Sequence, residues 1–301
     1  MLKTSHDNAT FSEMTKNHDV FEIESTMYRE IMPEFEELYR EAGVDVRFGP
    51  RAYEIATDKP YILLEDLRPK GFKNMNRLEG FDVEHTKAVL TRLAQWHAVS
   101  AARVARKGPF SPLISESLFN EENREMLKSI FNGMGNVFLK CVKDYNGHEE
   151  YYERLCEQKD NRINQLLEAN ITDESEFNVL NHGDCWSNNV MFRHDEQGKL
   201  LDTYLVDYQI THYGTPAQDL YYFLLSSTQY DIKIKKFDYF IKFYHDRLAE
   251  NLQLLKYPQK IPTLSEIHIL LHKYNAWGKC NRIFASLFFY IFYIFFFCLF
   301  L

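Results

Sequence analysis

The spacing of apolar and polar positions predicts strands early in the chain and helices later. Short apolar runs at 51–56 and 61–64 predict two strands joined as a hairpin, and similar runs at 190–192 and 204–206 predict two more. Apolar residues at helical spacing predict helices over 17–41, 83–106, 120–142, 149–169, 219–226, 235–255 and 264–272. Pro33 is expected to kink or interrupt the first helix. Helical content therefore rises from about residue 82.

One carboxylate lies on the apolar stripe of the first predicted helix. Glu24 shares helical spacing with Val20, Met27 and Ile31, so it falls on the apolar side of the helix rather than opposite it. A carboxylate on a buried face is costly unless it is paired, so a cationic partner is expected. The alternative is a partly exposed glutamate at the edge of the stripe.

The stretch 179–209 carries the strongest chemical signal. His182, Asp184 and Asn189 follow the order H-x-D-x-x-x-x-N between strand-like runs, and the second run ends at Asp207. These residues suit chemistry on a phosphate, because phosphoryl transfer depends mostly on positioning and metal clamping. Asp184 would accept or orient a hydroxyl proton, and His182 would brace the loop. Asn189 and Asp207 would hold Mg²⁺, which favours oxygen ligands. Each element taken singly is also common in turns and helix caps.

The whole pattern resembles a known family. HGDxWxNN at 182–189, followed by LVDYQ at 205–209, is similar to the ecdysteroid-kinase-like (CHK kinase-like) proteins, relatives of choline kinases and aminoglycoside phosphotransferases. The resemblance covers about residues 1–278 and includes FEIESTMYREIMPEFEELY, FGPRAY, ILLEDLRPKGFKNMNR, LAQWHAVSA and GTPAQDLYYFL. It implies ATP-dependent phosphorylation of a hydroxyl on a small molecule, for example an ecdysteroid. The fold that it implies is α+β and protein-kinase-like, with a small lobe over 1–66 and a mainly helical large lobe over 67–278.

The resemblance also assigns expected roles to residues outside the central stretch. Lys3 falls at the place of the strand lysine that pairs with the helix glutamate, here Glu24, and neutralises ATP phosphates. Read alone, a lysine at position 3 would be a frayed terminus. Glu65 and Leu67 fall at the hinge between lobes, where the backbone would meet adenine. Asp219 follows a proline and is expected to cap the helix that starts there, and in the family pattern it also braces the catalytic loop.

Several aromatic residues near the central stretch have two possible roles. Aromatic side chains usually belong to the core, but Trp186, Tyr208 and Tyr213 are predicted in loops near the proposed site and could face a bulky apolar substrate. Choline also remains possible, because aromatic faces bind quaternary ammonium groups. His97, on the apolar stripe of the helix over 83–106, is predicted to be a core histidine with satisfied hydrogen bonds rather than a metal ligand.

Charge and cysteine content bear on the partners and the cellular compartment of the protein. The net charge is −8 and the pI is about 5.8, so no basic field favours nucleic acid as a partner. The five cysteines have no CxxC spacing, which favours reduced thiols in the cytoplasm over disulfides or a cysteine zinc site. Residues 1–17 are polar, and no signal peptide is predicted.

Both ends of the chain depart from the family pattern. No glycine-rich loop precedes Lys3, so the small lobe is expected to be truncated. The tail over 279–301 is apolar: residues 283–301 are long enough to approach a membrane span and follow Lys279 and Arg282, although their aromatic content also fits a translated intron. The competing function is therefore a non-catalytic kinase-like remnant, anchored to a membrane if the tail inserts.

Overall fold

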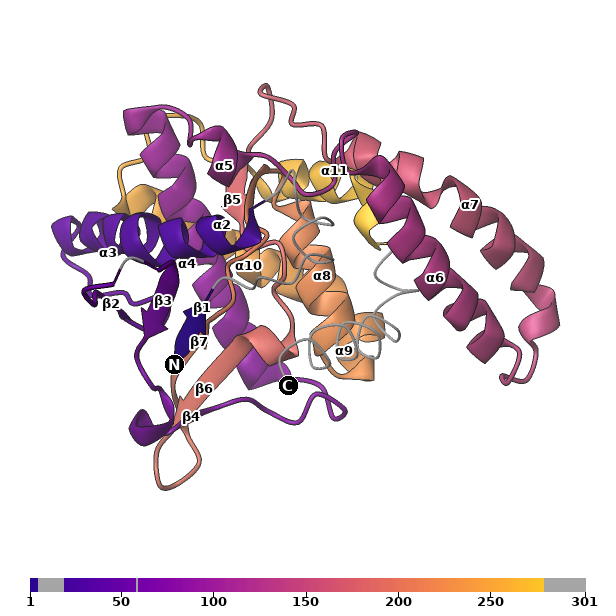
Figure 1. The fold of residues 1–301 in the computed structure, drawn as a ribbon, viewed down its shortest axis with the longest axis horizontal. Helices are drawn as coiled ribbons and strands as arrows, with labels where there is room; N and C mark the ends of the chain where they lie inside the picture. Colours follow the sequence, from indigo (N-terminus) through magenta and orange to yellow (C-terminus); the bar gives the residue numbers. More distant parts are fainter. Residues whose placement is uncertain (5–18, 58, 279–301) are drawn as a thin grey trace.

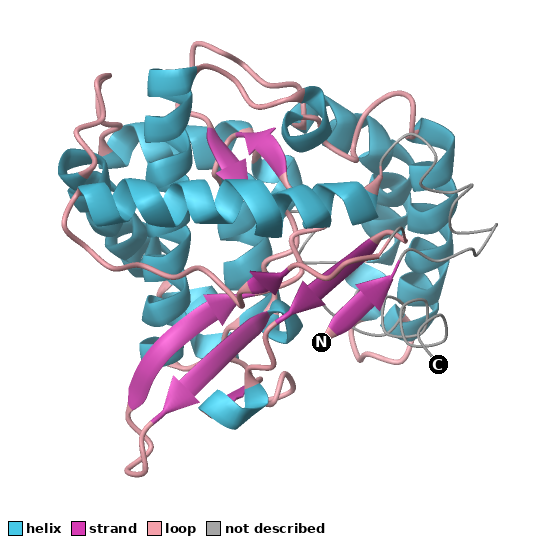
Figure 2. Ribbon diagram, turned by 60° about the vertical axis from the view of Figure 1, so that its left-hand side comes forward, coloured by secondary structure: helices cyan, strands magenta, loops and turns pink. Residues whose placement is uncertain are grey.

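A computed structural model describes residues 1–4, 19–57 and 59–278 (Figure 1). Three small antiparallel sheets carry the strands. The first has the order β1-β3-β2 (Leu2–Thr4, Tyr61–Leu64, Ala52–Tyr53), the second β4-β6-β7 (Phe72–Lys73, Val190–His194, Leu200–Leu205), and the third β5-β8 (Val179–Asn181, His212–Gly214). The first two sheets lie along one side of the molecule, whereas the β5-β8 pair lies among the helices (Figure 2).

Helices make up most of the remaining chain. The α-helices are α2 (Val20–Thr26), α3 (Met32–Glu41), α4 (Val83–Lys107), α5 (Pro112–Ser115), α6 (Arg124–Val142), α7 (Tyr152–Ala169), α8 (Ala217–Ser227), α9 (Tyr230–Lys235), α10 (Phe237–Leu254) and α11 (Leu264–Lys273). Shorter helical turns are η1 (Met27–Ile31), η2 (Arg68–Lys70), η3 (His148–Glu150) and η4 (Ser187–Asn189). The result is the predicted α+β fold with a mainly helical second part.

Most predicted elements are present, with two informative differences. The hairpin is confirmed, because Ala52 pairs with Leu64 in antiparallel register, although its first strand is short. Residues 235–255, predicted as one helix, form the end of α9 and then α10, which begins at Phe237. The short elements α5, β4 and β8 carry too few periodic residues to be predicted from spacing.

The first helix continues through Pro33 with a change of winding. Between α2 and α3 the turn Met27–Ile31 is a π-helix, in which the N–H of Met32 donates to the carbonyl of Met27. Pro33 then lies in the first turn of α3, where its missing N–H removes little helical bonding. The expected disturbance is therefore a wide turn just before the proline, and it begins two residues beyond Ser25 and three beyond Glu24.

The core centres on α4. Its apolar stripe, including Val89, Leu93 and Trp96, is fully buried, and the helix packs along much of its length against α10. Burying side chains of this size contributes roughly 1.5–3 kcal/mol each before the entropy cost of ordering them. The C-terminal half of the same helix also supports β5, because Ser100 Oγ accepts the N–H of Leu180 at 2.9 Å. The core helix therefore positions the strand that leads into residues 182–189.

No helix within the described ranges is long and apolar enough to cross a membrane. The predicted span over 283–301, like the rest of the apolar tail from 279, lies outside the described residues.

Candidate active site

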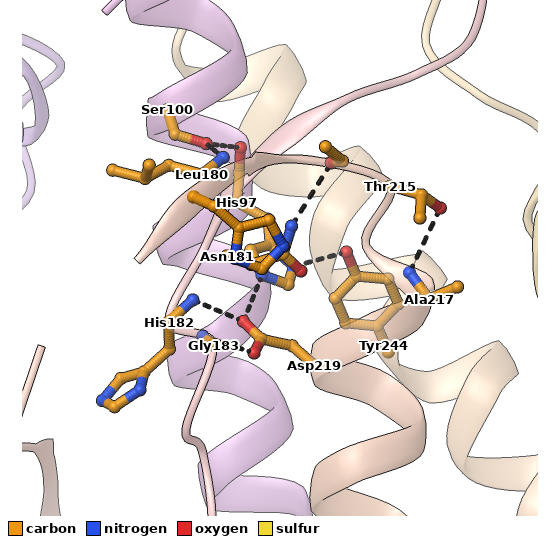
Figure 3. Close-up of polar contacts among 12 residues, drawn as sticks. His97, Ser100, Leu180, Asn181, His182, Gly183, Thr215, Ala217, Asp219 and Tyr244 are labelled. Atoms are coloured by element: carbon orange, nitrogen blue, oxygen red, sulfur yellow. Dashed lines mark hydrogen bonds and ion pairs between the residues drawn. The ribbon is translucent and has the colours of Figure 1, made fainter. Parts of the chain in front are cut away.

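Asp219 holds the backbone of the loop between β5 and η4 through hydrogen bonds. Its Oδ2 accepts the backbone N–H of His182 at 2.7 Å and its Oδ1 accepts that of Gly183 at 3.0 Å (Figure 3). The predicted capping role is wrong: α8 begins at Ala217 after Pro216, and Asp219 points from its first turn toward the loop instead of toward its own helix. The expected bracing contact is present.

A second layer of hydrogen bonds supports Asp219. His97 Nε2 lies 3.1 Å from Asp219 Oδ2, and its Nδ1 lies 2.8 Å from the hydroxyl of Tyr244 (Figure 3). His97 is therefore the satisfied core histidine that the sequence predicted. Burial would raise the pKa of Asp219, but the hydrogen bond and charge of His97, with the loop N–H donors, hold that pKa below its usual value. The carboxylate thus stays ionised while fully buried.

The loop depends on a glycine for its turn and on a histidine for its attachment to a neighbouring segment. Gly183 has φ of +82°, and a Cβ at this position would collide with the carbonyl oxygen of Ile210. His182 Nε2 donates to the carbonyl of Val206 at 3.1 Å, while Nδ1 accepts the N–H of Asp184 at 3.3 Å. Burial lowers the pKa of His182, which suits this neutral ring. The ring therefore joins the loop to the segment that follows β7.

Asp184 is buried with both carboxyl oxygens hydrogen-bonded. Tyr222 donates its hydroxyl to Oδ1 at 2.8 Å, and Asn189 donates its amide Nδ2 to Oδ2 at 2.8 Å and to the Asp184 carbonyl at 3.0 Å. Burial, reinforced by the charge of Asp207, raises the pKa of Asp184 to about 8, against the effect of these donors. Because Asn189 uses its nitrogen here, its amide oxygen is the atom that remains to bind a cation.

Asp207 faces this group from the end of β7. Its φ is +71°, a left-handed conformation that is uncommon outside glycine and often found at functional sites. The conformation is held by a 3.2 Å hydrogen bond from its N–H to the hydroxyl of Tyr28. Its carboxylate accepts Lys3 Nζ at 3.0 Å and Gln209 Nε2 at 3.3 Å. Asp207 is thus where the N-terminal sheet meets the second sheet.

The expected pair between Lys3 and Glu24 is present. Lys3 Nζ lies 2.7 and 2.8 Å from the two carboxyl oxygens of Glu24, which is buried at the end of α2. Burial alone would lower the pKa of Lys3, but the charges of Asp207 and Glu24 outweigh that effect and raise it. Lys3 pairs with Ile62 in β3, so the described N-terminus forms a strand and the frayed-terminus alternative is wrong.

The predicted hinge residues have structural partners of their own. Glu65 donates its N–H to the carbonyl of Arg51 at 2.8 Å, and its carboxylate pairs with Lys70. Leu67 is buried with Phe72 and accepts from its N–H at 3.2 Å. A role for this segment in binding adenine remains a prediction.

Two of the three predicted substrate-facing aromatics lie elsewhere. Tyr208 is fully buried, with its ring 4.5 Å from that of His182 and 4.9 Å from that of Trp96, so the substrate-facing prediction is wrong for it. Tyr213 packs near Phe110 and lines a hollow of about 800 Å³ whose described lining includes no residue of the Asp184 cluster. Trp186 lies in the loop, two residues after Asp184, and remains a candidate.

The donor set fits a magnesium ion in chemical type. Within the described ranges no group of three or more His, Cys, Asp or Glu side chains is arranged to hold a metal. Asp207 and Asn189 together offer a carboxylate and an amide oxygen, ligands that Mg²⁺ accepts while it keeps several waters and the phosphates of a nucleotide. Burial first, and the charge of Asp207 after it, raise the pKa of Asp184, and a cation beside Asp207 would offset the second of these causes.

Tyr222 and Tyr28 are the contacts that the sequence did not reveal. Tyr222 follows Asp219 by three residues and Tyr28 follows Glu24 by four, so each shares a helix face with a residue that was predicted. That spacing is the signal which could have identified them. It could not show that one hydroxyl meets Asp184 and the other the N–H of Asp207, because that depends on how α8 and η1 pack against the rest.

A strand lysine paired with a helix glutamate, facing a loop aspartate, an asparagine and a second aspartate, is the arrangement of kinase-like phosphotransferases. The chain belongs to the ecdysteroid kinase-like family, whose model matches residues 1–257. No curated protein matches it.

Similar solved structures include three small-molecule kinases or transferases. A choline/ethanolamine kinase family protein from Mesorhizobium loti is 11% identical, with 88% of this chain and 83% of that chain covered and a TM-score of 0.35. An ethanolamine kinase from Plasmodium vivax is 14% identical, with coverage of 87% and 74% and a TM-score of 0.35. An aminoglycoside phosphotransferase from Alicyclobacillus acidocaldarius is 14% identical, with coverage of 85% and 83% and a TM-score of 0.36.

Proposed function

We propose that this chain is a small-molecule kinase that transfers the γ-phosphoryl group of ATP to a hydroxyl of an alcohol. The observation that carries the proposal is the meeting of four side chains from distant parts of the sequence, Lys3, Asp184, Asn189 and Asp207. Phosphoryl transfer needs a proton acceptor, oxygen ligands for a metal and a cation for the phosphates in one place. These four residues supply all three.

Each residue then has a defined task. Asp184 accepts the proton of the acceptor hydroxyl and orients it, while Asn189 holds the carboxylate in place through Nδ2. The oxygens of Asn189 and Asp207 would hold Mg²⁺, which when bound offsets the negative charge of the phosphates. Lys3 would contact those phosphates, with Glu24 fixing its direction. Glu65 and Leu67 would border the adenine.

For the acceptor we propose a steroid alcohol of the ecdysteroid type. The support is the family to which the chain belongs, together with the aromatic side chains of Trp186 and Tyr222 next to Asp184 in sequence or in space. Tyr208 and Tyr213 no longer contribute to this argument, because the first is in the core and the second borders another hollow.

The test is turnover by the purified chain with Mg²⁺ and ATP, measured as ADP formation and as the added mass of phosphate on the acceptor. The panel should contain steroid alcohols, choline, ethanolamine and an aminoglycoside, with Asp184→Asn as the inactive control. We expect steroid alcohols to be phosphorylated fastest. Exclusive activity on aminoglycosides would refute the acceptor class, and no turnover of any acceptor would favour a non-catalytic remnant.

A further inference from the structure

Two histidines meet where α4 begins and β6 ends, at the opposite end of β6 from Asn189. His85 Nε2 and His194 Nε2 are 3.0 Å apart, and the ring centroids are 5.2 Å apart. No task in phosphoryl transfer requires this pair. It connects the core helix to the β6–β7 hairpin, which carries Asn189 at its start and leads to Asp207 at its end.

Asp82 fixes the orientation of His85. Its Oδ1 lies 2.8 Å from His85 Nδ1 and also accepts the backbone N–H of His85 at 3.0 Å, as the N-cap of α4. The Nδ1 proton therefore points to the carboxylate, and the Nε2 lone pair points to His194. The ring is held edge-on against Phe192, with centroids 4.8 Å apart. A histidine that gives one N–H to a carboxylate and presents its other nitrogen is the usual form of a metal-ligating histidine.

His194 can present its Nε2 in the same way. Its Nδ1 is buried without a hydrogen-bond partner in the described part of the chain, and its Nε2 has His85 Nε2 as its hydrogen-bond partner. A neutral ring that moves its proton from Nε2 to Nδ1 leaves the Nε2 lone pair free for an ion, with no net loss of a proton.

The spacing of the two nitrogens suits a tetrahedral metal. With Zn–N bonds of about 2.0–2.1 Å, two ligands of one tetrahedral ion lie roughly 3.3–3.4 Å apart. The observed 3.0 Å is within a few tenths of an ångström of that separation. The described residues supply no third ligand, so such a site would be open, with water in the remaining positions.

We propose that His85 and His194 form a two-histidine site for a borderline-soft divalent metal ion such as Zn²⁺, with Asp82 as the carboxylate that orients one ligand. The bound ion would connect the end of β6, in the β6–β7 hairpin, to the start of α4. Its occupancy would stabilise the fold, because an ion that binds only the folded chain shifts the unfolding equilibrium. The site is separate from the proposed magnesium site and does not depend on kinase activity.

The test is a calorimetric titration of the chelator-stripped chain with ZnCl₂, with thermal melts in excess chelator and in Zn²⁺. We expect saturable binding and a higher melting midpoint in Zn²⁺. His85→Gln or His194→Gln should each remove the binding. Asp82→Asn should weaken it about 10- to 100-fold, the usual cost of an outer-shell change, while asparagine still caps the helix.

Two controls separate this site from others. His148→Gln replaces a histidine on η3 whose Nδ1 lies 2.9 Å from a backbone carbonyl, and Asp207→Asn changes the proposed magnesium site. Both should bind Zn²⁺ as the unsubstituted chain does. Melts in chelator show whether each variant is folded. If the unsubstituted chain shows no saturable binding, the two histidines form a hydrogen-bonded pair only. The same holds if folded His194→Gln and Asp82→Asn variants bind Zn²⁺ as tightly as the unsubstituted chain.

Discussion

The two ends of the candidate site are built in different ways. Around Asp219 every contact is buried: its carboxylate, His97 and the loop backbone are all shielded from solvent, and hydrogen bonds connect them in two layers. Around Lys3 the contacts are ionic and partly open, since 26% of the Lys3 side chain and 25% of the Asp207 side chain remain exposed. The base of the loop is thus fixed by the core, whereas the phosphate end depends on a three-residue strand.

This difference assigns separate physical tasks to the two ends. Buried hydrogen bonds in a low-dielectric interior hold a geometry strictly, because leaving one of their atoms unpaired is costly. Partly exposed charge pairs are screened by solvent and contribute less to stability. In the proposed reaction, the loop that orients the hydroxyl needs the first kind of support, and a lysine that passes from Asp207 to a phosphate needs the second.

The largest expected effect is at the oxygen atoms that Asp184 presents to the acceptor. Asp184→Asn keeps the shape of the side chain but removes the proton acceptor, so turnover should fall by about 100-fold or more. The melting midpoint should change little, and it is measured alongside turnover as the control. Near-normal turnover in a folded variant would show that another group takes the proton.

A second substitution tests the open end of the site. Asp207→Asn removes the charge but keeps a residue that tolerates φ of +71°. Mg²⁺ should strengthen ATP binding to the unsubstituted chain. In the variant we expect that gain to fall by at least about tenfold, since even outer-shell changes cost this much. Fluorescence titration of a nucleotide analogue with and without Mg²⁺ measures it. An undiminished magnesium effect would place the ligand elsewhere.

The sequence predicted some residues of these two ends correctly and misassigned others. A carboxylate on an apolar stripe requires a cation, so the spacing predicted a partner for Glu24, and the family resemblance assigned Lys3 as that partner. His97 was predicted as a core residue from its position on a helix. Tyr208 was misassigned because a core aromatic and a substrate-facing aromatic have the same side chain, and only packing separates them.

The role of Asp219 also could not be decided from the sequence, because two roles share the same residue pattern. Helix capping and loop bracing both place an aspartate after a proline, and they differ only in where the carboxylate points. The structure starts α8 two residues earlier than predicted, so Asp219 lies inside the first turn and is free to reach the loop. Such a shift of two residues is within the ordinary uncertainty of helix ends.

At the buried end of the site, around Asp219, the effect to measure is on the free energy of unfolding rather than on turnover. In Asp219→Asn the new side chain has one acceptor oxygen, so at least one of the two loop N–H groups loses its partner. We expect a loss of roughly 2–3 kcal/mol in the free energy of unfolding, the scale of a hydrogen bond to a charged group. Denaturant melts at pH 7 measure it.

The same variant gives a pH test with a definite sign. Because the folded-state pKa of Asp219 is held below its ordinary value of about 3.9, its contribution is complete above that pH. It is lost as pH falls through the lower folded-state pKa. The stability difference between the chain and Asp219→Asn should therefore be constant from pH 5 to 7 and shrink below about pH 4. A difference that vanished near neutral pH would contradict the assignment.

The smallest expected effect is that of removing the Tyr222 hydroxyl, which contacts Asp184. Tyr222 projects from the helix that holds the loop and donates its hydroxyl to Asp184 Oδ1. Tyr222→Phe keeps the ring but frees that oxygen to rotate, so turnover should fall by about tenfold, the value of one hydrogen bond to a carboxyl group. Tyr221→Phe is the matched control, because the neighbouring tyrosine donates to the carbonyl of Leu271 instead, at 2.9 Å. Steady-state kinetics should show the loss in kcat for Tyr222→Phe with KM for ATP unchanged, and neither change for Tyr221→Phe. Equal losses in both variants would mean that α8 supports the loop only through Asp219.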